Sequence, residues 1–403
     1  MYKIKLSDNI PEPNPAKSDC IVAAHYYGAW KKGAAGLHNG FDDLHNYPER
    51  TPLCGYYDEE NPDLCDWEIK WASEHGVNCF IYCWYRYKEN MGKPVTEKAL
   101  RCAHGLHEAM FNAKFQKYMK FAIMYENSVR WGNTDREDLL NNLLPFWFET
   151  YFTRENYLVI DNKPVLFICA PDWLNGAFKT ASEQRKVFDE CREYAKKYGF
   201  DGLLISAAIW DYKKIDPEIY YDCDERGYDF HFGYDSGYVP EEDTDDDDEI
   251  IKGQCEMLKS RIAPNPMRAI PTASCFRDAE PRTTEAWNNL GYNFAAEKKY
   301  HLSPEGFRKL LSEMKAIVDK LPDGAWGKRI FMIDNWNEWD EGHYISPSHE
   351  FGFKYLQAIR EELTECDNLP DYRMPQDIGL SNFNKSWGEP DLSEECKKKF
   401  GVK

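Results

Sequence analysis

The sequence predicts an α/β protein with a single domain that is a (β/α)8 (TIM) barrel. Three observations lead to this prediction: eight short strand-like runs, helical patterns between them, and no nucleotide-binding fingerprint. Most of the runs are almost continuously apolar, as expected for parallel strands buried on both faces. Eight strands that alternate with helices favour a barrel over an open doubly wound sheet. The runs are 21–27, 77–84, 120–126, 164–170, 202–209, 228–234, 268–275 and 329–335.

Helical periodicity separates most of these strands. No Gly-x-Gly-x-x-Gly and no phosphate-loop signature follows any strand, which disfavours a Rossmann-type sheet. We expect the barrel to span residues 1–365. The polar, aperiodic residues 366–403 are expected to pack on the barrel or to trail from it. The expected helices cover 64–74, 96–111, 138–150, 182–198, 250–261, 304–320 and 351–362.

Composition excludes several classes of function. A chain of 403 residues with 42% hydrophobic and 30% charged residues can bury a large core. The net charge of −19 argues against nucleic-acid binding and against adsorption to anionic membranes. No stretch approaches the roughly 18 uncharged residues of a membrane span. Neither a nucleic-acid partner nor membrane insertion is therefore expected.

The thirteen cysteines are scattered and contain no Cys-x-x-Cys pair. They are typical of reduced thiols rather than of a disulfide framework. Residues 1–20 contain no apolar signal-peptide core, so we expect a cytoplasmic protein, or a secreted one if a signal has been removed. The acidic segment 241–249 lacks the spacing of a calcium loop and is expected to be a solvated, mobile loop. No metal and no organic cofactor is expected.

The most informative segment is 333–342, Ile-Asp-Asn-Trp-Asn-Glu-Trp-Asp-Glu-Gly. If its turn is helical, Glu338 and Glu341 project to one side with Cβ atoms roughly 5–6 Å apart. A retaining glycosidase needs its two carboxyl groups about 5–5.5 Å apart. Trp336 and Trp339 supply flat apolar faces on which sugars stack. The alternative is an ordinary solvated helix face, but such a face more often carries lysine and alanine than tryptophan.

Other polar and aromatic residues follow the predicted strands. The carboxyl ends of barrel strands converge on one mouth, so these residues are expected to meet there. Each residue alone could be structural, either an aromatic side chain of the core or a buried histidine whose hydrogen bonds are made. Their convergence on one mouth favours a binding site. The candidates for substrate binding are His25, Tyr26, Tyr27, Trp84, Tyr85, Glu126, Asn127, Trp210, Asp278, Arg282, Trp336, Asn337 and Trp339.

Several blocks resemble the glycoside hydrolase family 99-like group, also called WbsX-type glycan-processing domains. The most specific block is 335–342, Asn-Trp-Asn-Glu-Trp-Asp-Glu-Gly, followed by Tyr344-Ile345 and Pro347. Supporting blocks in the same order are 55–58, 77–85, 121–127 and 157–168. Together they extend from the first strand to the helix after the eighth.

The resemblance implies a barrel that hydrolyses α-linked sugars with retention, and endo-α-mannosidases are the characterised relatives. It implies that Glu341 is the general acid/base and that Glu338 removes a proton from the sugar's own 2-hydroxyl. The intermediate would then be a 1,2-anhydro sugar, and Glu126 would bind sugar hydroxyls. We expect opposed protonation states, with Glu341 protonated and Glu338 ionised.

Two segments depart from the family. Where the family often has Trp-Asp-Asn-Thr-Pro-Arg, this chain has Arg277-Asp278-Ala279-Glu280-Pro281-Arg282. The family's N-terminal sugar-binding loop is poorly matched by 31–39. Both differences predict a substrate other than that of the family. Two further functions are compatible with the sequence: a glycosyltransferase of surface-polysaccharide synthesis and a non-catalytic glycan-binding barrel. For the first, the segment 243–248 contains Asp-x-Asp only as part of an acidic run.

Overall fold

Eight parallel strands form the wall of a barrel, as the sequence predicts. The computed structural model describes residues 8–33, 40–128, 132–209, 224–283, 288, 293–380 and 383. The strand order is β8-β7-β6-β4-β2-β1-β12-β9, and every neighbouring pair is parallel. A parallel bridge between His231 and Ala269 brings the two ends together. The strands are β1 (Ile21–Tyr26), β2 (Cys79–Arg86), β4 (Lys120–Tyr125), β6 (Lys163–Ile168), β7 (Leu204–Ala208), β8 (Phe230–Phe232), β9 (Thr272–Ala273) and β12 (Ile330–Asn335).

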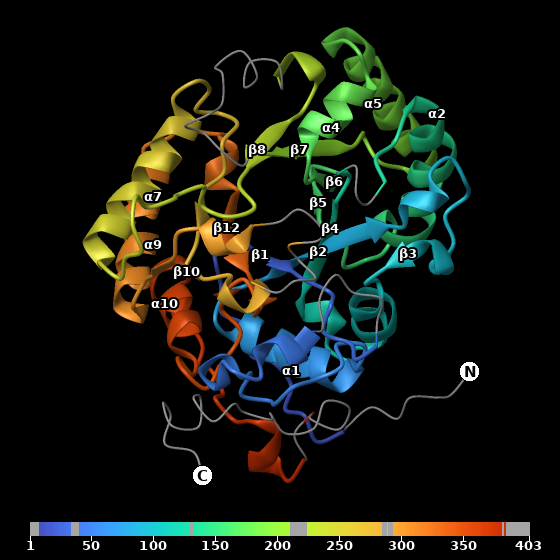
Figure 1. The fold of residues 1–403 in the computed structure, drawn as a ribbon. Helices are drawn as coiled ribbons and strands as arrows, with labels where there is room; N and C mark the ends of the chain where they lie inside the picture. The colour runs from blue at the N-terminus through green and yellow to red at the C-terminus, as the bar shows by residue number, and fades with distance from the viewer. Residues whose placement is uncertain are drawn as a thin grey trace.

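Helices surround the strands. Figure 1 shows α7, α9 and α10 on one side of the barrel, α1 below it, and α2, α4 and α5 on the opposite side. Six of the seven predicted helices are present, and the one predicted at 138–150 is a continuous helical stretch that includes π-type turns (η8, η9). The helices are α1 (Pro62–Glu74), α2 (Arg136–Asp138), η8 (Leu139–Leu143), α3 (Leu144–Trp147), η9 (Phe148–Phe152), α4 (Pro171–Ala177), α5 (Ala181–Ala195), α7 (Asp247–Ile262), α9 (Pro304–Val318) and α10 (Lys354–Leu363).

Local sequence explains these elements. All six residues of β12 are buried, because this strand lies between the barrel interior and the helix layer. Helix α1 begins at Pro62, which lacks an N–H, and Asn61 Oδ1 accepts from the Asp63 N–H at 3.0 Å. Helix α9 begins in the same way, with Ser303 Oγ accepting from the Gly306 N–H at 2.9 Å. Polar caps thus fix where the surrounding helices start.

The helix predicted at 96–111 is wrong. This segment forms a short turn, then β3 (Leu100–Arg101), then two further turns, η5 (Gly105–Ala109) and η6 (Met110–Asn112). Strand β3 pairs antiparallel with the end of β2, where Tyr85 faces Arg101. Cys102 follows with φ of +55°, which a helix cannot contain. The hydrogen bonds offered by the end of β2 therefore override the helical periodicity.

The acidic segment 241–249 is not simply a mobile loop. Its last residues form the N-cap and first turn of α7, where Asp246 Oδ1 accepts from the N–H groups of Asp248 and Glu249 at 3.0 and 3.1 Å. Carboxylates at this end are favoured by the unpaired N–H groups and the helix dipole. The helical role of the segment explains its acidity.

The described part of the segment after residue 365 contacts α1. Asn368 Nδ2 donates to the Glu74 carbonyl at 2.8 Å, and the Asp371 N–H donates to Glu74 Oε2 at 2.8 Å. A short turn, η14 (Pro375–Ile378), follows. Among the described residues, no helix is long and apolar enough to cross a bilayer.

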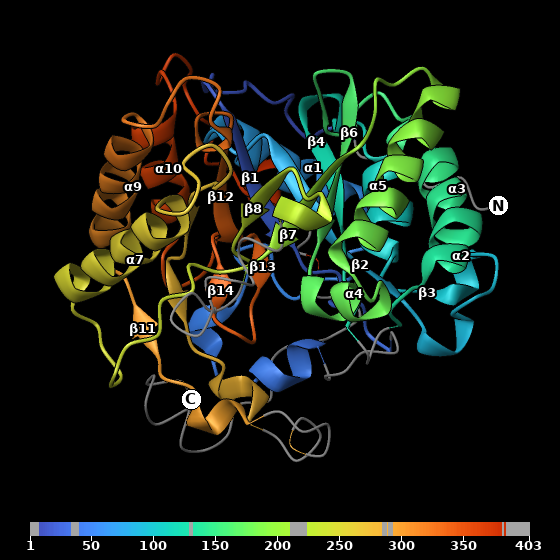
Figure 2. The ribbon, with the colours of Figure 1, turned by 90° about the horizontal axis from the view of Figure 1, so that it is seen from above.

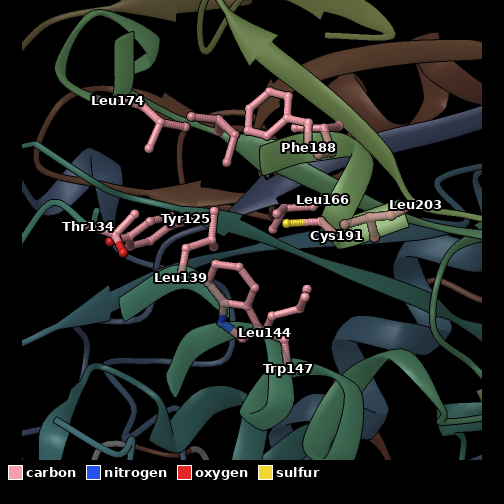
Figure 3. Close-up of a pocket in the computed structure, with 12 residues that line it drawn as sticks. Tyr125, Thr134, Leu139, Leu144, Trp147, Leu166, Leu174, Phe188, Cys191 and Leu203 are labelled. Atoms are coloured by element: carbon pink, nitrogen blue, oxygen red, sulfur yellow. The ribbon is translucent and has the colours of Figure 1, made fainter. Parts of the chain in front are cut away.

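One apolar gap lies between the strands and their helices (Figure 3). Its volume is about 10 Å³, and its lining includes Leu144, Leu166, Phe188 and Leu203. Because a single water would fill it and find few polar partners, this gap offers no ligand site. It lies between β4, β6 and β7 and the helices that cover them.

Candidate active site

The two candidate catalytic glutamates lie on a β-hairpin, and the helical turn expected from their spacing is wrong. After β12, the chain forms β13 (Asn337–Glu338) and β14 (His343–Tyr344), which pair antiparallel with Glu338 opposite His343. In Figure 2 this hairpin lies on the same side of the barrel as β3 and α4. Glu338 therefore stands on a strand and Glu341 in the tight turn that follows it.

Gly342 makes this turn possible. Its φ is +71°, and a Cβ at this position would lie 2.6 Å from the backbone nitrogen of Asp278. The Asp278 N–H donates to the Glu341 carbonyl at 2.9 Å. The glycine of the motif is thus needed for both its backbone angle and its closeness to the neighbouring chain.

Glu338 is almost fully buried and has three hydrogen-bond donors. Arg282 Nη2 donates to Oε1 at 3.0 Å, Asn335 Nδ2 donates to Oε2 at 2.9 Å, and the Tyr234 hydroxyl also donates to Oε2. Burial raises the pKa of Glu338 to about 7, the charge of Glu341 adds to the rise, and Arg282 opposes it. The raised pKa thus belongs to the glutamate that was expected to be ionised, because Glu338 is the more buried of the two. A carboxyl group with a pKa near neutrality is suited to proton transfer.

Arg282 joins both glutamates to a third carboxylate. Its guanidinium contacts Glu338, donates to Asp340 Oδ1 at 2.9 Å and pairs with Glu341 Oε1. Its side chain is 4% exposed and its charge lies 5.5 Å from the centre of the Tyr27 ring. The two candidate catalytic carboxyl groups are therefore bridged by one guanidinium, which holds them side by side.

Arg277 approaches Glu341 from the other side. Its Nη1 lies 3.8 Å from Glu341 Oε2, and its Nη2 pairs with Glu297 at 2.6 Å. Arg277 Nη1 also lies 2.9 Å from His343 Nε2, and because arginine can only donate, this nitrogen accepts. The remaining proton of His343 is then on Nδ1, which lies 2.5 Å from Asp334 Oδ2.

Three predicted residues face the barrel interior or its mouth beside this pair. His25 is buried with its ring centre 4.8 Å from that of Tyr234, and burial lowers its pKa to about 4, so it is neutral. Burial raises the pKa of Tyr85, and the nearby charges of Glu126 and Glu338 add to the rise. Glu126 is half-buried and accepts from Ser128 Oγ at 3.1 Å.

Four predicted substrate-binding aromatics are buried elsewhere, which corrects the prediction. The Tyr26 hydroxyl donates to Glu68 at 2.9 Å, and Trp84 Nε1 donates to Tyr151 at 2.9 Å, so both side chains point outward to the helix layer. Successive residues of a strand face opposite sides, and these two lie on the outer side. Trp336 and Trp339 are 0% exposed and offer no face to a sugar. Their indole N–H groups donate to Glu68 at 3.0 Å and Tyr57 at 2.9 Å.

Three predicted residues, Asn127, Asn337 and Asp278, make contacts that connect parts of the protein to one another. Asn337 Oδ1 accepts from the Tyr27 N–H at 2.8 Å, which ties the hairpin to β1, and Asn127 ties the end of β4 to Ala170 at 2.8 and 2.9 Å. Asp278 pairs with Arg50 at 2.7 Å. Burial opposes the charge of Asp278, but His301 and Arg50 hold its pKa well below the usual range. Trp210 lies outside the described residues.

Sequence reasoning missed three residues of this site, Tyr234, Asn335 and His343, and noted Arg277 only as a departure from the family. Tyr234 and Asn335 contact Glu338, and Arg277 and His343 flank Glu341. Tyr234 and Asn335 are the last residues of two predicted strands, 228–234 and 329–335, so their positions carried a signal. The contacts of His343 depend on the hairpin and had no signal in the sequence.

Comparison with known proteins supports the same family. A family model described as Glycosyltransferase WbsX matches residues 30–359. Two relatives from strains of Xanthomonas campestris pv. campestris, each called "Uncharacterized protein WxcX", are 22% and 21% identical over 363 residues. The alignments cover 84% of this chain and 48% of each relative, so the chain spans about half the length of these relatives.

Solved structures share the fold. A GH99 endo-alpha-mannosidase from Bacteroides thetaiotaomicron, in complex with BIS-TRIS-propane, has a TM-score of 0.54 and 13% identity, and the match covers 85% of this chain and 95% of that chain. A glycoside hydrolase-like protein has a TM-score of 0.58 and 17% identity, covering 88% and 98%. At these identities the likeness establishes the (β/α)8 fold alone.

Proposed function

This chain belongs to the family described as Glycosyltransferase WbsX, as its sequence motifs predict, and we propose that it is a retaining glycoside hydrolase. The proposed substrate is an α-linked oligosaccharide or polysaccharide, of the mannose type or with another sugar in its place. The fold shared with a GH99 endo-alpha-mannosidase supports a glycan-acting barrel. Cytoplasmic location stays a prediction from thiol usage.

One observation carries the proposal: Glu338 and Glu341 lie at the barrel mouth on one guanidinium, that of Arg282. A glycosidase needs two carboxyl groups close together, of which one takes a proton while the other gives one. The raised pKa of Glu338, about 7, lets it take a proton at neutral pH and return it later. Closeness and proton affinity are therefore both suited to this chemistry.

The proposed reaction has two steps. Glu338 first takes the proton of the sugar's 2-hydroxyl, O2 forms a bond to C1, and the glycosidic C1–O bond breaks while Glu341 protonates the departing oxygen. The Glu341 carboxylate then takes a proton from water, whose oxygen attacks C1. The C1–O2 bond breaks, and O2 recovers its proton from Glu338. One water is consumed, and two inversions at C1 retain the anomeric configuration. This scheme differs from the common one, in which a carboxylate attacks C1 itself.

The test is a glycan-library hydrolysis screen with products resolved by chromatography. We compare the wild-type protein with Glu341→Gln, and use Glu193→Gln on the exposed face of α5 as a control that removes one carboxylate elsewhere. We expect cleavage by the wild type and the control, and a loss of about three or more orders of magnitude in Glu341→Gln with unchanged Tm. Near-normal cleavage by Glu341→Gln would refute the assignment of this residue.

The family description favours a second candidate, a glycosyltransferase that builds surface polysaccharide. Such an enzyme binds an activated donor, so calorimetric titration with nucleoside diphosphates separates the two functions. Binding of a nucleoside diphosphate without any hydrolysis would favour transfer. Binding of glycans with neither activity would favour a non-catalytic barrel, although a glycan-binding site needs no pair of buried glutamates.

A further inference from the structure

One carboxyl oxygen of Glu341 has no hydrogen-bond donor among the residues that the structure describes. Arg282 pairs with Oε1, whereas Oε2 lies 3.8 Å from Arg277 Nη1. That distance exceeds the roughly 3.2 Å limit of an N–H···O hydrogen bond. The Glu341 side chain is 12% exposed, against 5% for Glu338, so it is the more accessible of the two. Oε2 is therefore the oxygen that can carry a proton to a leaving group.

Arg277 is close to this oxygen, but its protons are directed to other acceptors. Nη1 carries two protons. His343 Nε2 lies 2.9 Å from Nη1 and Asp235 Oδ2 lies 3.3 Å from it, so each accepts one proton. The Nε and Nη2 groups donate to Glu297 Oε2 at 3.0 and 2.6 Å. Neither proton of Nη1 is thus left for Glu341.

His343 can accept from Arg277 because Asp334 orients its ring. His343 lies on β14 and Asp334 on β12, and both side chains are buried. His343 Nδ1 lies 2.5 Å from Asp334 Oδ2, so the ring proton faces the carboxylate and the lone pair of Nε2 faces Arg277. Burial favours the neutral ring, whereas the charge of Asp334 raises the pKa of His343. A second proton would lie between Nε2 and the Arg277 donor, so the neutral ring makes this contact.

Without this acceptor, Arg277 is free to turn toward Glu341. A movement of Nη1 by about 1 Å would shorten its distance to Oε2 from 3.8 Å to about 2.8 Å, that of a charge-assisted hydrogen bond. An oxygen that accepts this N–H cannot hold a proton in the same direction. Where the family often has tryptophan at this position, there is no such donor. The need for an acceptor therefore arises from Arg277 itself.

We propose that His343 is a positioning residue for the acid step. By accepting an N–H of Arg277, it keeps Oε2 of Glu341 available to protonate the leaving group. The proposal rests on the proposed function and adds to it a residue that acts through Arg277. A purely structural His343 would anchor the hairpin, and its loss would slow the reaction of every substrate alike.

The test compares two leaving groups. The glycan cleaved in the library screen releases a sugar hydroxyl, which needs a proton, whereas a dinitrophenyl glycoside of the same glycan releases a phenolate, which does not. We measure kcat/KM for both with His343→Leu, which removes the acceptor, and with His343→Gln, whose side-chain oxygen can accept instead. His75→Leu is the matched control, because His75 is a fully buried histidine between α1 and β2, on the face opposite the mouth.

We expect His343→Leu to lose about 100-fold in kcat/KM on the glycan and less than about threefold on the dinitrophenyl glycoside, the same pattern as Glu341→Gln. His343→Gln should recover about tenfold of this loss. Adding Arg277→Met to His343→Leu should recover a similar factor, because it removes the donor that blocks Oε2. His75→Leu should show no dependence on the leaving group. Equal losses on both substrates, or a double variant less active than His343→Leu, overturn the proposal.

A second measurement does not depend on activity. Asp334→Asn keeps the size of the side chain, but its amide can donate to His343 Nδ1 and so leave the ring proton on Nε2. In a crystal structure of this variant, we expect Arg277 Nη1 about 2.8 Å from Glu341 Oε2. A distance that stays near 3.8 Å overturns the positioning role but not the hydrolase. A wild-type protein that cleaves no glycan refutes the hydrolase, and this distance still decides whether His343 holds Arg277 away from Glu341.

Discussion

Replacement of Glu338 by glutamine removes a buried charge from the centre of the site. The folded protein holds the pKa of Glu338 at about 7, against an ordinary value of 4.5. Between these pH values the folded state binds more protons than the unfolded state, so the stability contributed by this group falls as pH rises. The difference in pKa corresponds to about 3 kcal/mol, lost between pH 4.5 and about 7.

Glutamine has no proton to lose, so Glu338→Gln should not show this loss. We therefore expect the free energy of unfolding of the variant, relative to wild type, to increase by about 3 kcal/mol from acidic to mildly alkaline pH. For a chain of this length the increase is about 4 °C in Tm. Comparing two pH values cancels any fixed cost of placing an amide beside Arg282, Tyr234 and Asn335. Activity should be lost at every pH.

The assay is thermal unfolding followed by circular dichroism at pH 5 and pH 8, with reversibility checked at each. Glu193→Gln is the control, because its carboxylate is 71% exposed and its removal should change Tm equally at both pH values. A stability difference between Glu338→Gln and wild type that is the same at pH 5 and pH 8 would refute the reasoning. Such a result would mean that the Arg282 charge and the three donors fully compensate burial.

Three further outcomes follow from the same geometry. Tyr234→Phe removes a hydrogen bond that favours the charged form of Glu338, so we expect the acidic limb of the pH–rate profile to move to higher pH, measured as kcat/KM against pH. Gly342→Ala should cost about 2 kcal/mol or more in urea unfolding. Gly324→Ala should cost less, because its φ is also positive, +83°, but a Cβ there would lie 3.8 Å from Met267 Cε, an ordinary contact. Burial raises the pKa of Glu68 from 4.5 to about 8, so the stability contributed by this group falls between these pH values in the wild type but not in Glu68→Gln. Thermal unfolding across pH 5 to 9 should therefore show the variant gaining stability relative to the wild type as pH rises to about 8, with no further gain above it.

The fold was predictable because parallel strands buried on both faces leave a simple signal. Strand β12 is apolar for four residues and then turns polar at Asp334, where the mouth begins. The predicted strand 228–234, which contains Asp229 and His231 among its apolar residues, is short in the structure, with three residues in β8. The segment 96–111 was mispredicted because its helical spacing competes with hydrogen bonds from the end of β2, which lies outside the segment. Local periodicity contains no information about such a partner.

The orientation of the site residues was only partly predictable. Alternation along β1 puts His25 and Tyr26 on opposite sides, and alternation along β2 separates Trp84 from Tyr85, so a period of two already divides these residues into inner and outer sets. The buried partners of Trp336 and Trp339 were not predictable, because Glu68 and Tyr57 are distant in sequence. An aromatic residue beside a catalytic motif can therefore either bind a sugar or fill the core, and only its burial in the structure distinguishes these two roles.

From their spacing, Glu338 and Glu341 were expected to project together from a helical turn, whereas the structure brings both to Arg282 from a β-hairpin. On a helix, residues three apart meet because of the helical turn, whereas here the hairpin separates them and Arg282 joins them again. This difference has a chemical consequence. Arg282 contacts Oε1 of Glu341, so a proton that Glu341 gives to a leaving group must reside on Oε2, the oxygen 3.8 Å from Arg277. Where the family often has tryptophan, this chain therefore places a cation beside the oxygen that performs the proposed acid catalysis.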